Sequence, residues 1–62
     1  MSVTTYVRLG TGEREHTSPL SIWEIEQRLD AGQCIPVVIR GEEVRAAPAG
    51  VVYFFERADD EA

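Results

Sequence analysis

The chain has 62 residues, of which 44% are apolar, and it carries 11 acidic against 6 basic side chains, for a net charge of −5. One domain is the most that this length can fold, and the excess of carboxylates disfavours binding to nucleic-acid phosphates or to an anionic membrane. A single cysteine and a single histidine exclude an internal disulfide and a zinc site of three or four Cys or His ligands within one chain.

The two strands predicted before the helix differ in hydrophobicity. Residues 3–9, VTTYVRL, alternate between two faces and are rich in β-branched and aromatic side chains, so we predict a strand. The following GTG at residues 10–12 breaks this pattern and suits a hairpin loop. Residues 13–17, EREHT, are polar throughout, so a second strand there can only be an exposed edge strand.

Residues 18–33, SPLSIWEIEQRLDAGQ, contain the clearest helical signals. Two starts compete: Ser18 can cap a helix that has Pro19 in its first position, or Ser21 can cap it and form a capping box with Glu24. Both predict a helix that begins at residue 19–22 and ends near residue 31. Gly32 supplies the left-handed residue that terminates it.

Three further strands are predicted after the helix. Residues 34–40, CIPVVIR, form a strand in which Pro36 requires an edge position or a bulge. Residues 41–43 make a tight turn into a short antiparallel strand at 44–47, and residues 48–50 form a bend or one helical turn. The run VVYFFE at residues 51–56 is the last strand, and residues 57–62 form an acidic disordered tail. A single domain therefore covers residues 1–56.

The order strand, strand, helix, strand, strand, strand predicts an α+β fold. Short connections between sequential strands favour an antiparallel sheet of four or five strands, open or curled into an SH3-like partial barrel, with the helix on one face. The apolar stripe of the helix would cover this face together with strand side chains. The expected core comprises Ile22, Ile25, Leu29, Val7, Leu9, Ile35, Val37, Ile39 and Val44.

The five consecutive apolar residues at 51–55 exceed what one face of a sheet needs. Simple alternation would turn Val51, Tyr53 and Phe55 toward the core, and Val52 and Phe54 away from it. Three explanations for the second set compete: enclosure in a small barrel, shielding by the aromatic side chains at positions 6 and 23, or an interface with another chain.

Few residues have the arrangement that catalysis or ligand binding requires. We expect His16 on the surface, because a catalytic histidine needs an orienting carboxylate and a reacting group beside it. Glu13 and Glu15 are the candidates to orient it. Cys34 follows the helix C-terminus and is expected to be a buried, inert thiol. The acidic residues at 24 and 26, 42 and 43, and 59–61 are expected to be solvated, and GTG lacks the lysine of a phosphate loop. We therefore predict no catalytic residue, no cofactor and no metal site.

An aromatic side chain on an acidic helix and the apolar last strand are the features that remain. Aromatic residues beside charged ones are typical of protein interfaces, although the tryptophan can also simply flank the core. The candidate interaction surface therefore comprises Trp23, Val52, Phe54 and Tyr6.

The pattern YVRLGTGE…SIWEIEQRLDAGQCIPVVIRGEEVRAAPAGVVYFFE resembles short α+β proteins of GC-rich, actinobacteria-like bacteria and their phages. Its last part, GEEVRAAPAGVVYFFE, is similar to the terminal strands of small SH3-like or Sm-like barrels. The resemblance implies an outline of hairpin, helix and strand pair, and it assigns a function to no residue.

The leading hypothesis is a small non-enzymatic interaction or regulatory module, phage-encoded in one version, whose partner is another protein or a second copy of the chain. The alternative is an acidic mimic of nucleic acid that inhibits a DNA- or RNA-binding protein and carries its carboxylates along one face. An enzyme ranks third, because no paired nucleophile and base is visible. Without a signal-peptide pattern or a long apolar segment, we expect a cytoplasmic location and no membrane contact.

Overall fold

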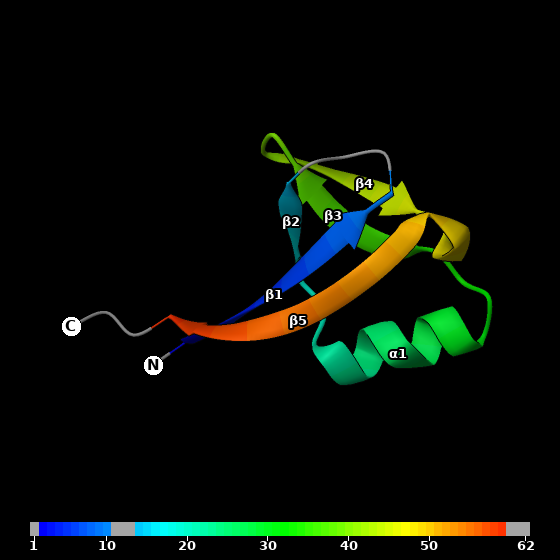
Figure 1. Cartoon of the computed structure of the whole chain (residues 1–62), viewed down its shortest axis with the longest axis horizontal. Helices are drawn as coiled ribbons and strands as arrows, with labels where there is room; N and C mark the ends of the chain where they lie inside the picture. Colours follow the sequence, from blue (N-terminus) through cyan, green and yellow to red (C-terminus); the bar gives the residue numbers. More distant parts are fainter. Residues whose placement is uncertain (1, 11–13, 60–62) are drawn as a thin grey trace.

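The computed structural model describes residues 2–10 and 14–59. In this part of the chain five antiparallel strands form one open sheet, and a single helix packs on one of its faces (Figure 1). The order along the chain is β1 (Ser2–Leu9), β2 (Glu15–Ser18), α1 (Ile22–Asp30), β3 (Ile35–Ile39), β4 (Glu42–Ala46), the 3₁₀ turn η1 (Pro48–Gly50) and β5 (Val51–Asp59). The predicted α+β class and element order are confirmed. The sheet does not close into a barrel, since the spatial order β4-β3-β2-β1-β5 leaves two separate edges.

The helix α1 begins at the second of the two predicted caps. The Ser21 hydroxyl accepts a hydrogen bond from the Glu24 amide at 3.2 Å, and the Glu24 carboxylate accepts one from the Ser21 amide at 3.3 Å. This reciprocal capping box satisfies two of the amides that a helix start leaves without intrahelical partners. Gly32, at φ 74°, ends the helix as predicted: its amide bonds to the Leu29 carbonyl, and the next amide bonds to the Arg28 carbonyl.

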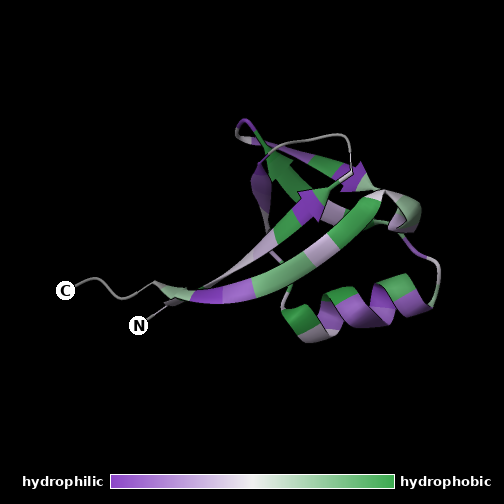
Figure 2. Cartoon of the chain, in the orientation of Figure 1, coloured by the Kyte–Doolittle hydropathy of each residue, from purple (hydrophilic) through white to green (hydrophobic). Residues whose placement is uncertain are grey.

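The strand β2 lies in the middle of the sheet, between β1 and β3, so the prediction of an exposed edge strand is wrong. Figure 2 shows it as a hydrophilic strand among more apolar neighbours. Its short polar side chains are tolerated because they find partners: Ser18 is buried and its hydroxyl donates to the Pro36 carbonyl at 2.8 Å. Of the predicted GTG loop before β2, Thr11 and Gly12 lie outside the described residues.

The strand β3 is an interior strand in continuous register with β4, so the edge position or bulge expected for Pro36 is also absent. The carbonyl of Pro36 is directed toward β2, and in a strand the nitrogen of the same residue points the same way. On that side the described residues pair only through Thr17 and Val38. The N–H that Pro36 lacks would have pointed toward the short β2–β3 ladder. The β3–β4 ladder therefore keeps its hydrogen bonds.

The β3–β4 turn is a two-residue loop made of Arg40 and Gly41, one residue earlier than predicted. Both have positive φ angles, 53° and 80°, as in a type I′ hairpin turn. Glu42 and Glu43, which we expected in the turn, therefore belong to β4. The predicted helical turn at 48–50 is confirmed as η1.

The strand β5 contains a bulge that reverses the predicted facing of its aromatic residues. Leu9 lies opposite Val51 and Arg8 lies opposite Tyr53, so Val52 is an additional residue in β5. After it, Phe54 lies opposite the buried Val7 on the helix side, and Tyr53 and Phe55 lie on the other face. The strand also continues through Asp59, although we expected the tail to begin at residue 57, while residues 60–62 lie outside the described residues.

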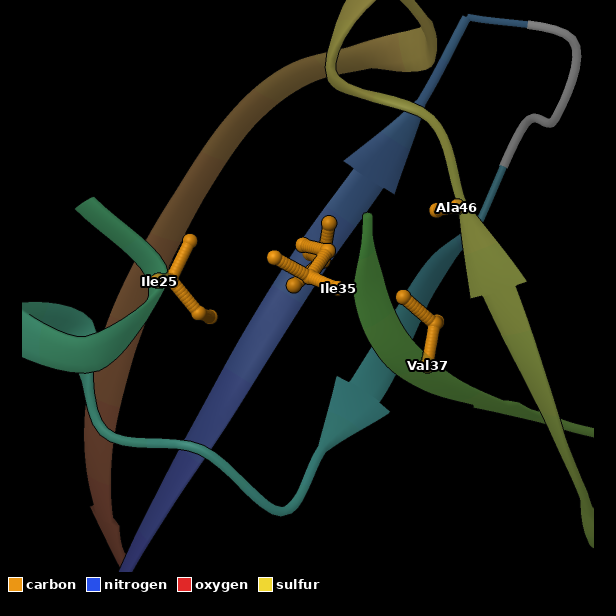
Figure 3. Close-up of a cluster of buried hydrophobic side chains, with 5 residues drawn as sticks. Ile25, Ile35, Val37 and Ala46 are labelled. Carbon is orange, nitrogen blue, oxygen red and sulfur yellow. The ribbon is translucent and has the colours of Figure 1, made fainter. Parts of the chain in front are cut away.

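The core lies between α1 and the covered face of the sheet. Figure 3 shows Ile25 from the helix beside Ile35 and Val37 of β3, with Ala46 at the end of β4. Sequence analysis had placed most of these residues in the core and missed Ala46. Val44 was predicted to belong to the core, but it is 37% exposed and lies outside it. Partly buried side chains surround the cluster: Leu9, Leu20, Leu29, Ile39, Val51 and Phe54.

Candidate functional site

A shallow groove runs between α1 and β5 and contains two of the four predicted interaction residues. The helix contributes Trp23, Glu26, Gln27 and Asp30, which recur at the spacing of one helical stripe, and β5 contributes Phe54. Leu29 forms part of the floor, where the groove meets the core. We call this set of six residues the α1–β5 groove.

Trp23 is 65% exposed, the highest exposed fraction among the large apolar residues described. The apolar stripe of α1 that contains Ile25 and Leu29 faces the core. Trp23 belongs to the neighbouring stripe, which lies at the side of the helix and not beneath it. The interpretation of Trp23 as a core flank is therefore wrong. An indole exposed to this extent at the rim of a groove is typical of a binding surface.

Phe54 forms the opposite wall of the groove. Its ring packs against the core cluster and is half-buried, because the bulge at Val52 turns it toward the helix. We had expected Phe54 to point away from the core, so this position is corrected. The corrected position is what brings it into the groove that also contains Trp23.

The groove is acidic at the end where the helix terminates. Glu26 and Asp30 are exposed, and none of the six described lining residues is basic. The helical arginine, Arg28, does not line the groove but an adjoining hollow, which shares Trp23 and Gln27 with it. The charged side chains that line the α1–β5 groove are therefore all negative, which favours a cationic ligand.

Tyr6, the third predicted interaction residue, lies on the face of the sheet that the helix does not cover. Its ring stacks on Phe55 with centroids 5.3 Å apart, and Phe55 in turn stacks on Tyr53 at 6.2 Å. The Arg57 guanidinium carbon lies 5.5 Å from the Tyr6 centroid. We call Tyr6, Phe55 and Tyr53 the aromatic ladder, because its rings stack in sequence. The second explanation for the apolar run had placed Tyr6 over Val52 and Phe54, whereas Tyr6 stacks on Phe55 and Val52 is exposed.

A hydrogen bond fixes the outer end of the aromatic ladder. The Tyr53 hydroxyl donates to the Glu15 carboxylate at 2.7 Å, across β1 from β5 to β2. Because the carboxylate favours the protonated phenol, this bond raises the pKa of Tyr53, and Arg8 opposes the shift. Long polar side chains therefore border this face of the sheet, as they do on an ordinary solvated sheet face. The α1–β5 groove has less of this character.

Val52, the fourth predicted interaction residue, is 62% exposed and lies at the bulge. The Val52 side chain lies beside Gly10, at the end of β1. Its Cγ2 atom would be 3.6 Å from a Cβ atom at position 10, which is an ordinary contact distance. The structure thus divides the predicted surface: Trp23 and Phe54 share the groove, Tyr6 lies on the opposite face, and Val52 lies near the β1 end.

No pattern in the sequence indicates that Glu26, Gln27 and Asp30 share a groove with Phe54, because the bulge that rotates Phe54 has no local signature. A search for lining residues on the stripe of Trp23 would have found the three helical positions. They lie three, four and seven residues after Trp23, and such residues share one side of a helix.

The residues considered for chemistry remain apart from the groove. His16 is half-buried in β2, opposite Val7. Cys34 is exposed, so the prediction of a buried thiol is wrong. Glu13, a candidate to orient His16, lies outside the described residues. Among the residues described, no three His, Cys, Asp or Glu side chains are grouped as a metal site would require.

The only helix in the described part of the chain, α1, has nine residues and is too short and too polar to cross a membrane. Comparison of the chain with protein-family models, with curated protein sequences and with solved structures found no significant match.

Proposed function

We propose that the chain is a small, non-enzymatic interaction module that binds another protein in the α1–β5 groove. The observation that carries this proposal is the exposure of Trp23 at the rim of a groove whose other wall is Phe54. Tryptophan is enriched among the residues that dominate binding energy at protein interfaces.

The exposed surface of Trp23 supplies part of the binding energy that such a partner needs. A tryptophan side chain presents up to about 250 Å² of surface, so covering the 65% that is exposed removes roughly 160 Å² from water. At about 25 cal/mol per Å², this corresponds to at most ~4 kcal/mol before the cost of association is subtracted. A partner that also contacts Phe54 and Leu29 would gain more.

The composition of the groove favours binding over catalysis. The six described lining residues offer an indole, a phenyl ring, an aliphatic side chain, an amide and two exposed carboxylates. None of these six has the hydroxyl, thiol or imidazole that most nucleophilic or proton-transfer mechanisms use. This set of side chains supports recognition more than it supports catalysis.

The alternative, an acidic mimic of nucleic acid, has less support from the arrangement of charge. Glu26 and Asp30 lie in the groove, whereas Glu15 lies on the uncovered face, directly opposite Arg8. A mimic requires a continuous row of acidic groups that follows the spacing of phosphates. The described carboxylates are instead distributed over both sides of the sheet.

Peptide selection tests the proposal. Random peptides displayed on phage are selected against the immobilised chain, and their affinities for wild type, Trp23→Ala and Tyr53→Ala are measured by calorimetry. Tyr53 is the matched control, because it is a 42% exposed aromatic residue on the opposite face.

We expect binding to fall at least tenfold in Trp23→Ala and less than twofold in Tyr53→Ala. Light scattering after size exclusion of the free chain shows whether a second copy occupies the groove, in which case Trp23→Ala separates the copies. Ligands that bind both variants equally, or a selection that yields none, would contradict the proposal.

A further inference from the structure

The helix α1 carries two i,i+4 charge pairs of opposite character. Glu24 and Arg28 are of opposite sign, with the acid in the first turn and the base in the last, which is the stabilising arrangement. Glu26 and Asp30 carry the same charge at the same spacing, and such a pair destabilises a helix.

The position of Asp30 adds a second unfavourable interaction. It is the last residue of α1, where the unpaired carbonyl groups give the helix end a partial negative charge. A carboxylate there is repelled both by Glu26 and by the helix terminus. Local rules of sequence design are broken in this way most often at functional sites.

We propose that the α1–β5 groove recognises a lysine or arginine side chain of the partner protein, an inference that rests on the proposed function. The cation would lie between the indole of Trp23 and the carboxylates of Glu26 and Asp30. These three residues belong to one stripe of the helix and line one groove.

Each part of a basic side chain has a counterpart in the groove. The charged end gains from the two carboxylates, whose mutual repulsion it relieves, and from the face of the Trp23 ring. The aliphatic stem packs on Phe54 and Leu29, as the stems of long basic side chains do on apolar surfaces. A purely apolar ligand would satisfy the walls and leave the two carboxylates without a counter-charge.

Charge complementarity also selects between a basic partner and a second copy of the chain. Each copy has a net charge of −5, so two copies repel one another at long range. A basic segment of another protein is attracted to the same groove, and its association is accelerated at low salt. We therefore assign the groove to a heterologous basic partner.

Two synthetic peptides that differ in one charge test this inference. The probe is acetyl-Ala-Leu-Arg-Leu-Ala-amide, and its control has citrulline, an uncharged analogue of similar shape, in place of arginine. Trp23 is the only tryptophan in the chain, so its fluorescence reports directly on the groove. We expect the arginine peptide to bind roughly tenfold more tightly than the citrulline peptide.

The variant Asp30→Lys separates binding from folding. It replaces the repulsion by a favourable Glu26–lysine pair and puts a positive charge at the helix end, so we expect its melting temperature to rise by roughly 2–6 °C. The same change should abolish the preference for the arginine peptide. The control Glu43→Gln, which removes one negative charge on β4 away from the groove, should retain it.

The outcomes distinguish this inference from the proposed function. If both peptides change Trp23 fluorescence with equal affinity, the groove binds peptides and cation recognition is refuted. If neither peptide changes it, cation recognition is refuted, and the proposed function is then decided by the peptide selection with Trp23→Ala and Tyr53→Ala. Retention of the arginine preference in Asp30→Lys would refute the role of the two carboxylates.

Discussion

The two walls of the α1–β5 groove should respond very differently to truncation. Trp23→Ala and Phe54→Ala each remove an aromatic side chain from the same groove. Phe54 packs against the core, whereas Trp23 is 65% exposed. We therefore expect Phe54→Ala to lower the free energy of unfolding strongly and Trp23→Ala to lower it only slightly.

The magnitudes follow from the covered areas. Phe54 is half-buried, and covering roughly 150 Å² of its side chain contributes about 3–4 kcal/mol to stability. Trp23 has about 90 Å² covered, an upper bound of ~2 kcal/mol, and alanine recovers about 0.5 kcal/mol through its higher helix propensity. Because a chain of this length has roughly 3–9 kcal/mol of stability, Phe54→Ala should leave a population that is partly unfolded.

Urea denaturation followed by circular dichroism measures both variants. Phe54→Leu, which keeps most of the apolar volume, should cost less than about 1.5 kcal/mol and serves as the control. If Trp23→Ala destabilises the protein as much as Phe54→Ala does, the indole is part of the core. The argument that Trp23 is available to a partner would then be refuted.

Three further predictions concern the sheet. Arg40→Asn should stabilise the protein by about 0.5–1 kcal/mol, because asparagine tolerates the positive φ of the type I′ turn better than arginine does; no rise in the melting temperature would contradict this. Ser18→Ala should destabilise it by about 1–2 kcal/mol in the same assay, since the Pro36 carbonyl loses its donor; a neutral result would show that this bond contributes nothing. Glu15→Gln should lower the pH at which Tyr53 ionises, measured by absorbance at high pH against Tyr53→Phe. Since the Tyr53 pKa is raised in the folded protein, its contribution to stability is present below the ordinary tyrosine pKa and is lost as the pH rises through the folded value; an unchanged titration in Glu15→Gln would refute the effect of the bond.

Local signals in the sequence predicted the elements that are stabilised locally. The capping box of Ser21 and Glu24 and the terminating Gly32 depend on residues within a few positions of one another, and the structure confirms all three. The strands at 3–9 and 51–56 were also found, because their β-branched and aromatic composition favours extended backbone.

The errors about β2 and β5 concern interactions between residues distant in sequence. The polar strand β2 is central, where it pairs with β1 and β3, and its Ser18 hydroxyl bonds to the Pro36 carbonyl, 18 positions away. The faces of Tyr53, Phe54 and Phe55 depend on the bulge opposite Arg8 and Leu9, and no local pattern reveals it. The candidate site was therefore half predicted: the sequence indicated Trp23 and Phe54, and only the fold shows that Glu26 and Asp30 join them.

The short contact between β2 and β3 has a consequence for how the molecule opens. Within the described residues, the register joins these strands through Thr17 and Val38, while β1 and β5 pair along eight positions of β1. The β3–β4 hairpin can therefore detach as a separate cooperative unit while β1 and β5 remain paired. Its departure would uncover Ile35 and Val37 to solvent, and amide exchange in this hairpin would be faster than in the centre of β1.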